Sequence, residues 1–181
     1  MSKVYTAACV IIPPREKWAP IQAIRTKYDR HVHRWMPHIN LLYPFLEMSK
    51  FSADQHERFR EACQHFPSFE IQLAEFKFFS HRYNNHTIWL SPEPRDQVSA
   101  LQKEVLKVVP ECNDVNRFKG GYTPHLSVGQ VKGRTKLKKL LTRFQSDWEP
   151  LSFNVGEIYI ISREDQKSSK FSIDETFALS Y

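Results

Sequence analysis

The segments PHINLLYPF (residues 37–45) and YTPHLSVGQ (residues 122–130) repeat one short pattern, once in each half of the 181-residue chain. Each segment has a proline followed by a histidine, and then an aliphatic, a polar and a second aliphatic residue. The histidine is His38 in the first copy and His125 in the second. One copy would be common by chance, whereas two copies inside apolar, strand-like segments point to a shared role.

Alternation along a strand places the histidine and the polar residue of each copy on one face. Because side chains i and i+2 of a strand point to the same side, His38 lies beside Asn40, and His125 lies beside Ser127. The aliphatic residues between them point to the opposite face, which predicts one buried side for each strand. If the two strands come together in the fold, two imidazoles and two hydrogen-bond donors converge on one pocket.

This set of side chains suits the cleavage of a phosphodiester bond. A neutral imidazole can accept a proton from water, and a protonated one can donate a proton to the leaving oxygen; a histidine pKa of about 6.5 allows both near neutral pH. The Asn40 amide and the Ser127 hydroxyl can donate hydrogen bonds to the non-bridging phosphate oxygens, where charge develops. No carboxylate cluster accompanies the histidines, so we expect neither a metal ion nor another cofactor.

The two segments resemble the signature of the 2H phosphoesterase superfamily, which includes 2′-5′ RNA ligase-like proteins and cyclic phosphodiesterases. That signature consists of two His-x-Thr/Ser-x motifs, one in each of two pseudo-symmetric lobes. The resemblance implies a bilobal α+β fold whose antiparallel sheets line a central groove. It also implies that His38 and His125 take the catalytic positions, and that Asn40 and Ser127 take the phosphate-binding positions. Asn40 departs from the pattern, because the family usually has a hydroxyl there.

The activity that this resemblance implies is the metal-independent hydrolysis of 2′,3′-cyclic phosphates or of 2′-5′-linked RNA and nucleotides. Two alternatives remain open at this point. One is a non-catalytic RNA- or nucleotide-binding module, for which Asn40 in place of a hydroxyl would be a sign. The other is a 3′-5′ RNA exonuclease of the same fold. In each case the expected partner is an RNA end or a nucleotide, without a membrane partner, and the protein is expected to act as a monomer.

The composition is that of an ordinary globular protein. Hydrophobic residues make up 41% and charged residues 25% of the chain, which excludes a mainly disordered protein. No apolar run approaches the roughly 18–20 residues needed to span a bilayer, and the N-terminal segment lacks a signal-peptide profile, so we expect an intracellular, cytoplasmic or nuclear protein. The three cysteines form no C-x-x-C pair and are expected to remain reduced. We expect residues 1–181 to form one bilobal domain of two interleaved lobes, with the motifs at 38–41 and 125–128.

The positive charge of the chain is concentrated in one segment. The net charge is +6, and residues 132–143 contain six basic residues and no acidic residue. Leu137, Leu140, Leu141 and Phe144 recur at helical spacing, which predicts an amphipathic helix. The polar face of this helix is either an ordinary solvated surface or a surface that binds phosphates.

The remaining periodicities predict short strands alternating with helices, as in an α+β or α/β domain with substantial sheet. A change of parity near Ala74 and Glu75 predicts a β-bulge, and Ser52 is a candidate helix cap. The polar segment 110–121 ends in two glycines, which favours a mobile loop between the lobes. The expected strands are 4–12, 37–45, 69–79, 86–90, 122–131, 152–162 and 170–179, and the expected helices are 16–30, 52–66, 93–109 and 132–144.

Overall fold

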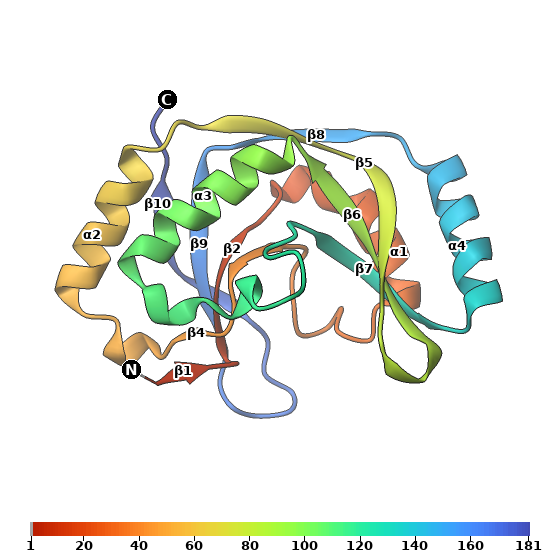
Figure 1. Ribbon diagram of the computed structural model, residues 1–181, viewed down its shortest axis with the longest axis horizontal. Helices are drawn as coiled ribbons and strands as arrows, with labels where there is room; N and C mark the ends of the chain where they lie inside the picture. Colours follow the sequence, from red (N-terminus) through yellow and green to blue (C-terminus); the bar gives the residue numbers. More distant parts are fainter. Residues whose placement is uncertain (1) are drawn as a thin grey trace.

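Two four-stranded antiparallel sheets organise the computed structural model, which describes residues 2–181 (Figure 1). The first sheet contains, in spatial order, β10 (Ser172–Ala178), β9 (Glu157–Ser162), β2 (Ala7–Ile11) and β3 (Ile39–Leu42). The second sheet contains β7 (Leu126–Lys132), β6 (Asn85–Glu93), β5 (Phe69–Ser80) and β8 (Leu151–Val155). A further two-stranded sheet pairs β1 (Lys3–Val4) with β4 (Phe45–Leu46). The strands that follow the two histidines, β3 and β7, therefore each form an edge of their sheet.

Two of the helices, α1 and α3, contact the sheet that they do not follow in the chain, whereas α2 and α4 pack on the sheet beside them (Figure 1). The four α-helices are α1 (Trp18–Tyr28), α2 (Ala53–Gln64), α3 (Arg95–Val108) and α4 (Arg134–Asp147). Short 3₁₀ turns occur at Arg15–Lys17, Met48–Lys50, Arg82–Asn84, Pro110–Cys112 and Asp114–Asn116. Helix α1 follows β2 of the first sheet but packs on β7 of the second, and α3 follows β6 of the second sheet but also contacts β3 of the first. Helix α2 packs on α3 and β10, and α4 packs on β5 and β7.

One hydrophobic cluster runs through both sheets and ties the lobes together. Ile39 and Leu41 of β3 and Leu126 and Val128 of β7 are fully buried in this cluster, while the polar residues between them remain half-buried. This alternation confirms that each motif strand has one buried side. Among residues 2–181, no helix has both the length and the apolar character needed to cross a membrane.

Two local predictions are confirmed in detail. The pairing of β5 with β6 shifts register between Leu73 and Glu75, which is the predicted bulge. At the start of α2 the Ser52 hydroxyl accepts a hydrogen bond from the Gln55 amide, and the Gln55 side chain accepts one from the Ser52 amide. This reciprocal pair is a capping box, which satisfies two backbone donors that the first turn of a helix otherwise leaves free.

The expected strand over 152–162 is wrong as a single element. The chain breaks at Gly156 into β8, which pairs with β5 of the second sheet, and β9, which pairs with β2 and β10 of the first. Leu151 and Phe153 are buried at odd positions, whereas Ile158 and Ile160 are buried at even positions. The change of phase reflects a passage from one sheet to the other, and β9 and β10 then form the expected terminal hairpin.

Both motif strands begin later than expected. The hydrogen-bonded ladder starts at Ile39 in β3 and at Leu126 in β7, so each histidine occupies the residue just before its strand. The segment expected as a loop over 110–121 contains two 3₁₀ turns, and its Asp114 carboxylate forms an ion pair with Lys3. That ion pair attaches the segment to the short N-terminal strand β1.

Candidate functional site

The two histidine motifs lie at facing edges of different sheets rather than on paired strands. No ladder joins β3 to β7 within residues 2–181, so the two strands are not hydrogen-bonded neighbours in one sheet. The Tyr122 hydroxyl, three residues before His125, donates a 2.7 Å hydrogen bond to the backbone carbonyl of Asn40. This bond connects the second motif directly to the first. The structure therefore brings the predicted residues of both motifs into one region.

The two imidazoles are anchored in the same way. Nδ1 of His38 donates a 2.7 Å hydrogen bond to the Met36 carbonyl, and Nδ1 of His125 donates one of 2.7 Å to the Thr123 carbonyl. A carbonyl can only accept, so the proton of each neutral ring is on Nδ1 and the lone pair is on Nε2. Within residues 2–181, no hydrogen bond engages either Nε2. Each ring therefore offers a free Nε2 that can accept a proton.

Aromatic rings hold both imidazoles in place. The His38 ring stacks on Trp35 with centroids 4.4 Å apart and planes 16° apart. Trp35 also stacks on Phe171, at a centroid distance of 3.8 Å. The His125 ring meets the edge of Phe79 at 4.9 Å and lies 5.8 Å from Trp89. Both histidines are half-buried as residues.

Burial changes the protonation of both rings. Burial lowers the pKa of His38 to about 4, with further lowering by the Arg25 guanidinium and by His125, while the Met36 carbonyl and Asp29 oppose it. Burial also lowers the pKa of His125, and the Thr123 carbonyl opposes this shift. Both imidazoles are therefore neutral at pH 7 in the free protein. An anionic phosphate between them would favour the protonated form and raise either pKa.

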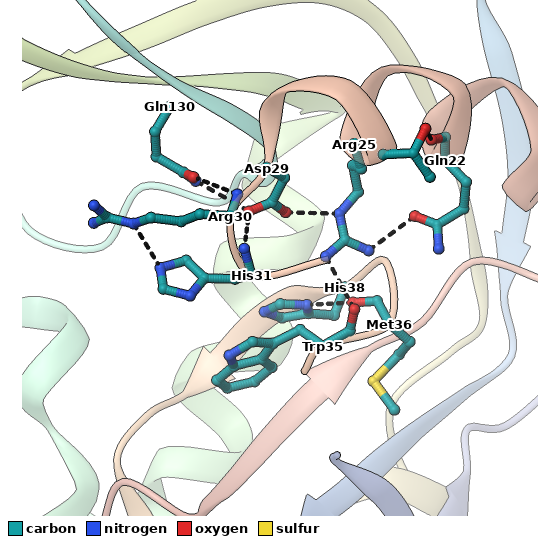
Figure 2. A network of polar contacts seen from close by, with 10 residues as sticks. Gln22, Arg25, Asp29, Arg30, His31, Trp35, Met36, His38 and Gln130 are labelled. Atoms are coloured by element: carbon teal, nitrogen blue, oxygen red, sulfur yellow. Dashed lines mark hydrogen bonds and ion pairs between the residues drawn. The ribbon is translucent and has the colours of Figure 1, made fainter. Parts of the chain in front are cut away.

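A buried ion pair supports the loop that carries the first histidine (Figure 2). Nε of Arg25 donates to Oδ2 of Asp29 at 2.9 Å, and the two side chains are only 2% and 4% exposed. The other guanidinium nitrogens donate to the Gln22 side chain at 3.0 Å and to the Trp35 carbonyl at 2.9 Å. Because Trp35 stacks on His38, this last bond connects helix α1 to the ring of the first motif.

The same network reaches the strand of the second motif (Figure 2). Oδ1 of Asp29 accepts from the His31 amide at 2.9 Å and from Nε2 of Gln130 at 3.2 Å. Oε1 of Gln130 in turn accepts from the Arg30 amide at 3.1 Å. Gln130 belongs to β7, the strand that also carries Ser127. The network therefore joins the first-motif loop to the second-motif strand.

Sequence reasoning did not find this network. One signal was present, because Arg25 lies four residues after Ile21 and three before Tyr28, on the apolar face of the helix. A charged residue on such a face is rarely buried without a partner, and Asp29 stands at the i+4 position where a partner fits. The contribution of Gln130, more than a hundred residues away, had no local signal.

Two buried polar atoms near the motifs have no hydrogen-bond partner within residues 2–181. They are Oδ1 of Asn40 on β3 and Nε1 of Trp89 on β6. Trp89 pairs in register with Ser127, so the two atoms belong to the two motif regions. Buried polar groups without partners are rare in folded proteins and tend to occur at sites under functional constraint. A threonine or serine at position 40 would have no amide oxygen, so this unsatisfied atom comes with the asparagine.

A separate cavity of about 390 Å³ lies elsewhere, between the first sheet and the C-terminal residues. Its lining includes Ile12, Asn154, Tyr159 and Tyr181, and none of the four motif residues. The candidate site therefore rests on the geometry of the two motifs and not on this cavity.

The fold matches solved structures along nearly its whole length. The protein TT0787 of Thermus thermophilus superposes with a TM-score of 0.66 at 16% identity, covering 96% of this chain and 97% of that chain. E. coli LigT complexed with 3′-AMP gives 0.63 at 14% identity, covering 99% and 100%. Usb1 of Kluyveromyces marxianus gives 0.51 at 14% identity, covering 96% and 97%. Similarities at such low identity establish the fold alone, and that fold is the bilobal one with antiparallel sheets that the motifs implied.

No curated protein sequence gives a significant match to this chain. The family model of the 2′-5′ RNA ligase superfamily matches residues 13–167, a span that contains both histidine motifs and every element from α1 to β9. The superfamily includes phosphoesterases and ligases, which are phosphoryl-transfer enzymes. The match spans most of the chain, so this protein belongs to the 2′-5′ RNA ligase superfamily of 2H phosphoesterases.

Proposed function

We propose that this protein is a metal-independent phosphodiesterase that hydrolyses 2′,3′-cyclic phosphates or 2′-5′-linked RNA and nucleotides. The observation that carries the proposal is the equivalence of the two imidazoles. His38 and His125 each donate Nδ1–H to the carbonyl two residues earlier, and each leaves Nε2 free. Two such rings at facing sheet edges can act on opposite sides of one phosphorus atom.

In the proposed reaction, water attacks phosphorus while the neutral Nε2 of one histidine accepts a proton from that water. A bond forms between phosphorus and the water oxygen, and the bond between phosphorus and the ribose oxygen breaks. The other histidine, protonated at Nε2, donates its proton to the leaving ribose oxygen. The products are a phosphomonoester and a free hydroxyl. The first histidine is now protonated and the second is neutral, so the two rings have exchanged protonation states. Asn40 Nδ2 and Ser127 Oγ would donate to the non-bridging oxygens as charge develops there.

The charge of the substrate has a direct part in this scheme. Both histidines are neutral in the free protein, because burial lowers the pKa of each. The general acid must therefore take up a proton when the anionic phosphate binds. The phosphodiester anion supplies the opposite charge that raises the pKa of a neighbouring imidazole. The LigT structures that contain 3′-AMP and phosphate are consistent with a phosphate ligand in this fold.

The decisive test is turnover in excess EDTA on three substrates: a 2′,3′-cyclic mononucleotide, a 2′-5′ oligoadenylate, and a short RNA that ends in a cyclic phosphate. His38→Ala and His125→Ala should each lower kcat by about 10²-fold or more, because a positioned acid or base contributes at least that much. His33→Ala removes an exposed histidine of the same loop region and serves as the matched control. Wild-type rates in both motif variants would refute the proposal.

The replacement of the family hydroxyl by Asn40 favours one second candidate, an RNA- or nucleotide-binding module that has lost turnover. The amide is longer than a threonine hydroxyl, and its buried oxygen has no hydrogen-bond partner in the described part of the chain, residues 2–181. This candidate predicts tight binding of RNA ends without product formation, and binding that weakens as salt rises. Fluorescence anisotropy with a labelled RNA end, run beside the turnover assay, separates the two functions.

A further inference from the structure

The exposed half of α4 is rich in basic residues and contains no acidic residue between Arg134 and Arg143. Its basic residues, together with the last residue of β7, are all solvent-exposed and are called here the α4 strip: Lys132, Arg134, Lys136, Lys138, Lys139 and Arg143. The opposite face of the helix buries Leu137, Leu140 and Phe144 in the common core. Within residues 2–181, no member of the α4 strip lies within ion-pair distance of an acidic side chain. The helix is therefore held by its apolar face, and the charges of its outer face are uncompensated.

This arrangement opposes the stability of the free helix. Arg134 and Lys136 lie in the first turn, where the helix dipole favours negative charge, and Gly133 provides no side-chain cap. Arg134 stands four residues before Lys138, and like charges at this spacing destabilise a helix. A polyanion bound along the α4 strip would remove both unfavourable effects. The pattern is therefore typical of a surface that binds a polyanion and not of one shaped only for solubility.

Strand β7 connects the second motif of the candidate active site to the α4 strip. Strand β7 runs from Ser127 of the second motif to Lys132 at the start of the strip. The β5–β6 hairpin approaches the same point, because the Gly133 amide donates to the Asn84 carbonyl at 2.9 Å. The neighbouring residue of that hairpin, Tyr83, is 84% exposed and has a positive φ of 60°. An exposed aromatic ring on this turn can stack on an unpaired base, so it favours a single-stranded nucleic acid over a membrane or an acidic protein as the partner.

The distances set the length of strand that would reach this surface. From Ser127 to Lys132, β7 extends about 17 Å at roughly 3.3 Å per residue. From Arg134 to Arg143, the helix adds about 14 Å at 1.5 Å per residue. At about 3.4 Å per stacked nucleotide, a strand held at the motif histidines reaches the strip after about five nucleotides and follows it for about four more.

We propose that the α4 strip and the tip of the β5–β6 hairpin bind the backbone of a single-stranded RNA whose end lies between His38 and His125. The placement of the reacting end rests on the proposed function above. The preferred substrate is then the end of an RNA chain of more than about five nucleotides, and a free cyclic mononucleotide, which cannot reach the strip, is a poor one.

The test compares Lys136→Gln/Lys138→Gln/Lys139→Gln with a matched triple variant. The control, Lys50→Gln/Lys103→Gln/Lys107→Gln, removes the same charge from exposed lysines on other elements. Affinity for a labelled 20-nucleotide RNA is measured by anisotropy over a range of salt. Loss of three phosphate contacts should lower the salt slope by about 2 and weaken binding by about 100-fold at 0.1 M salt. The control should bind like the wild type.

Turnover separates this proposal from the proposed function. The α4 variant should lose at least tenfold in kcat/KM on a 20-nucleotide RNA that ends in a cyclic phosphate, and should keep the wild-type value on a cyclic mononucleotide. Equal RNA affinity in the α4 variant and the wild type would overturn the proposal, as would binding to phosphatidylserine vesicles without binding to RNA. If the wild type turns over neither substrate, the proposed function fails, and the anisotropy difference still decides whether the strip binds RNA.

Discussion

The buried ion pair between Arg25 and Asp29 gives a sharp prediction for stability. Arg25→Met keeps much of the volume of the side chain but removes the guanidinium, which donates to Asp29, Gln22 and the Trp35 carbonyl. The Asp29 carboxylate, 4% exposed, would then remain buried with only the His31 amide and the Gln130 side chain as donors. A buried charge that loses its partner is the costly case.

The magnitude follows from this uncompensated charge. Removing one partner of a buried ion pair typically costs about 3–5 kcal/mol, whereas replacing both partners by apolar residues is far less costly. We therefore expect Arg25→Met to lower the free energy of unfolding by about 3–5 kcal/mol. The double variant Arg25→Met/Asp29→Leu should be more stable than Arg25→Met alone, although the Trp35 carbonyl still lacks its donor. Urea unfolding followed by far-UV circular dichroism measures both values.

Helix α2 provides the matched control. Arg58 and Asp54 have the same four-residue spacing at 4.0 Å, but their side chains are 55% and 80% exposed. Arg58→Met should change the free energy of unfolding by no more than about 0.5 kcal/mol, because exposed ion pairs contribute little. If Arg25→Met costs no more than Arg58→Met, or if the double variant is less stable than the single one, the assigned role of the buried pair is wrong.

Three further predictions test the site and its support. Asn40→Leu should lower kcat on a cyclic phosphate by about 10²-fold, which is the usual effect of losing one oxyanion donor. Asn40→Thr should keep kcat within tenfold of wild type and raise the free energy of unfolding in urea by about 1 kcal/mol, because it removes the buried oxygen that has no partner within residues 2–181. Burial lowers the pKa of His38 to about 4, below its unfolded value of about 6.5, so the unfolded chain binds more protons between these two pH values. The free energy of unfolding should therefore fall as the pH is lowered from 6.5 to 4, by up to about 1.4 kcal/mol per pH unit. His38→Gln should flatten that slope in urea titrations, and an unchanged slope would contradict the assignment. Gly129→Ala should cost about 1–3 kcal/mol in thermal or urea unfolding, because the new Cβ would lie 2.7 Å from Cβ of Tyr28 and 3.2 Å from its carbonyl; Gly156→Ala, which meets only the Asn154 side chain, should cost less.

The features predicted well from the sequence depend on short-range rules. The buried faces of β3 and β7 follow from alternation over five residues, and the capping box at Ser52 depends on a residue three positions later. The bulge near Ala74 is visible as a change of parity within one strand. In each case the physical cause and the sequence signal lie within a few residues of each other, so one sequence is enough to predict these features.

The features that the sequence did not predict depend on contacts between distant segments. The buried residues change phase within 152–162, but a bulge inside one strand would give the same signal, so the sequence does not show that the chain changes sheets at Gly156. The packing of α1 on β7 and the hydrogen bond from Gln130 to Asp29 likewise join segments about a hundred residues apart. Such contacts are set by the whole fold, which local periodicity does not encode.

These long-range contacts also fix the relative position of the groups that the proposed chemistry needs. No hydrogen-bonded ladder fixes β3 relative to β7 within residues 2–181, so the spacing of the two imidazoles is not determined by sheet geometry. It depends on the bond from Tyr122 to Asn40 and on the chain of contacts from Gln130 through Asp29 and Arg25 to Trp35. Catalytic groups must be held within a fraction of an ångström to be effective. A buried and costly ion pair is therefore best understood as a fixed connection between the lobes, which holds two histidines from separate halves of the chain in the arrangement that the proposed reaction at one phosphate requires.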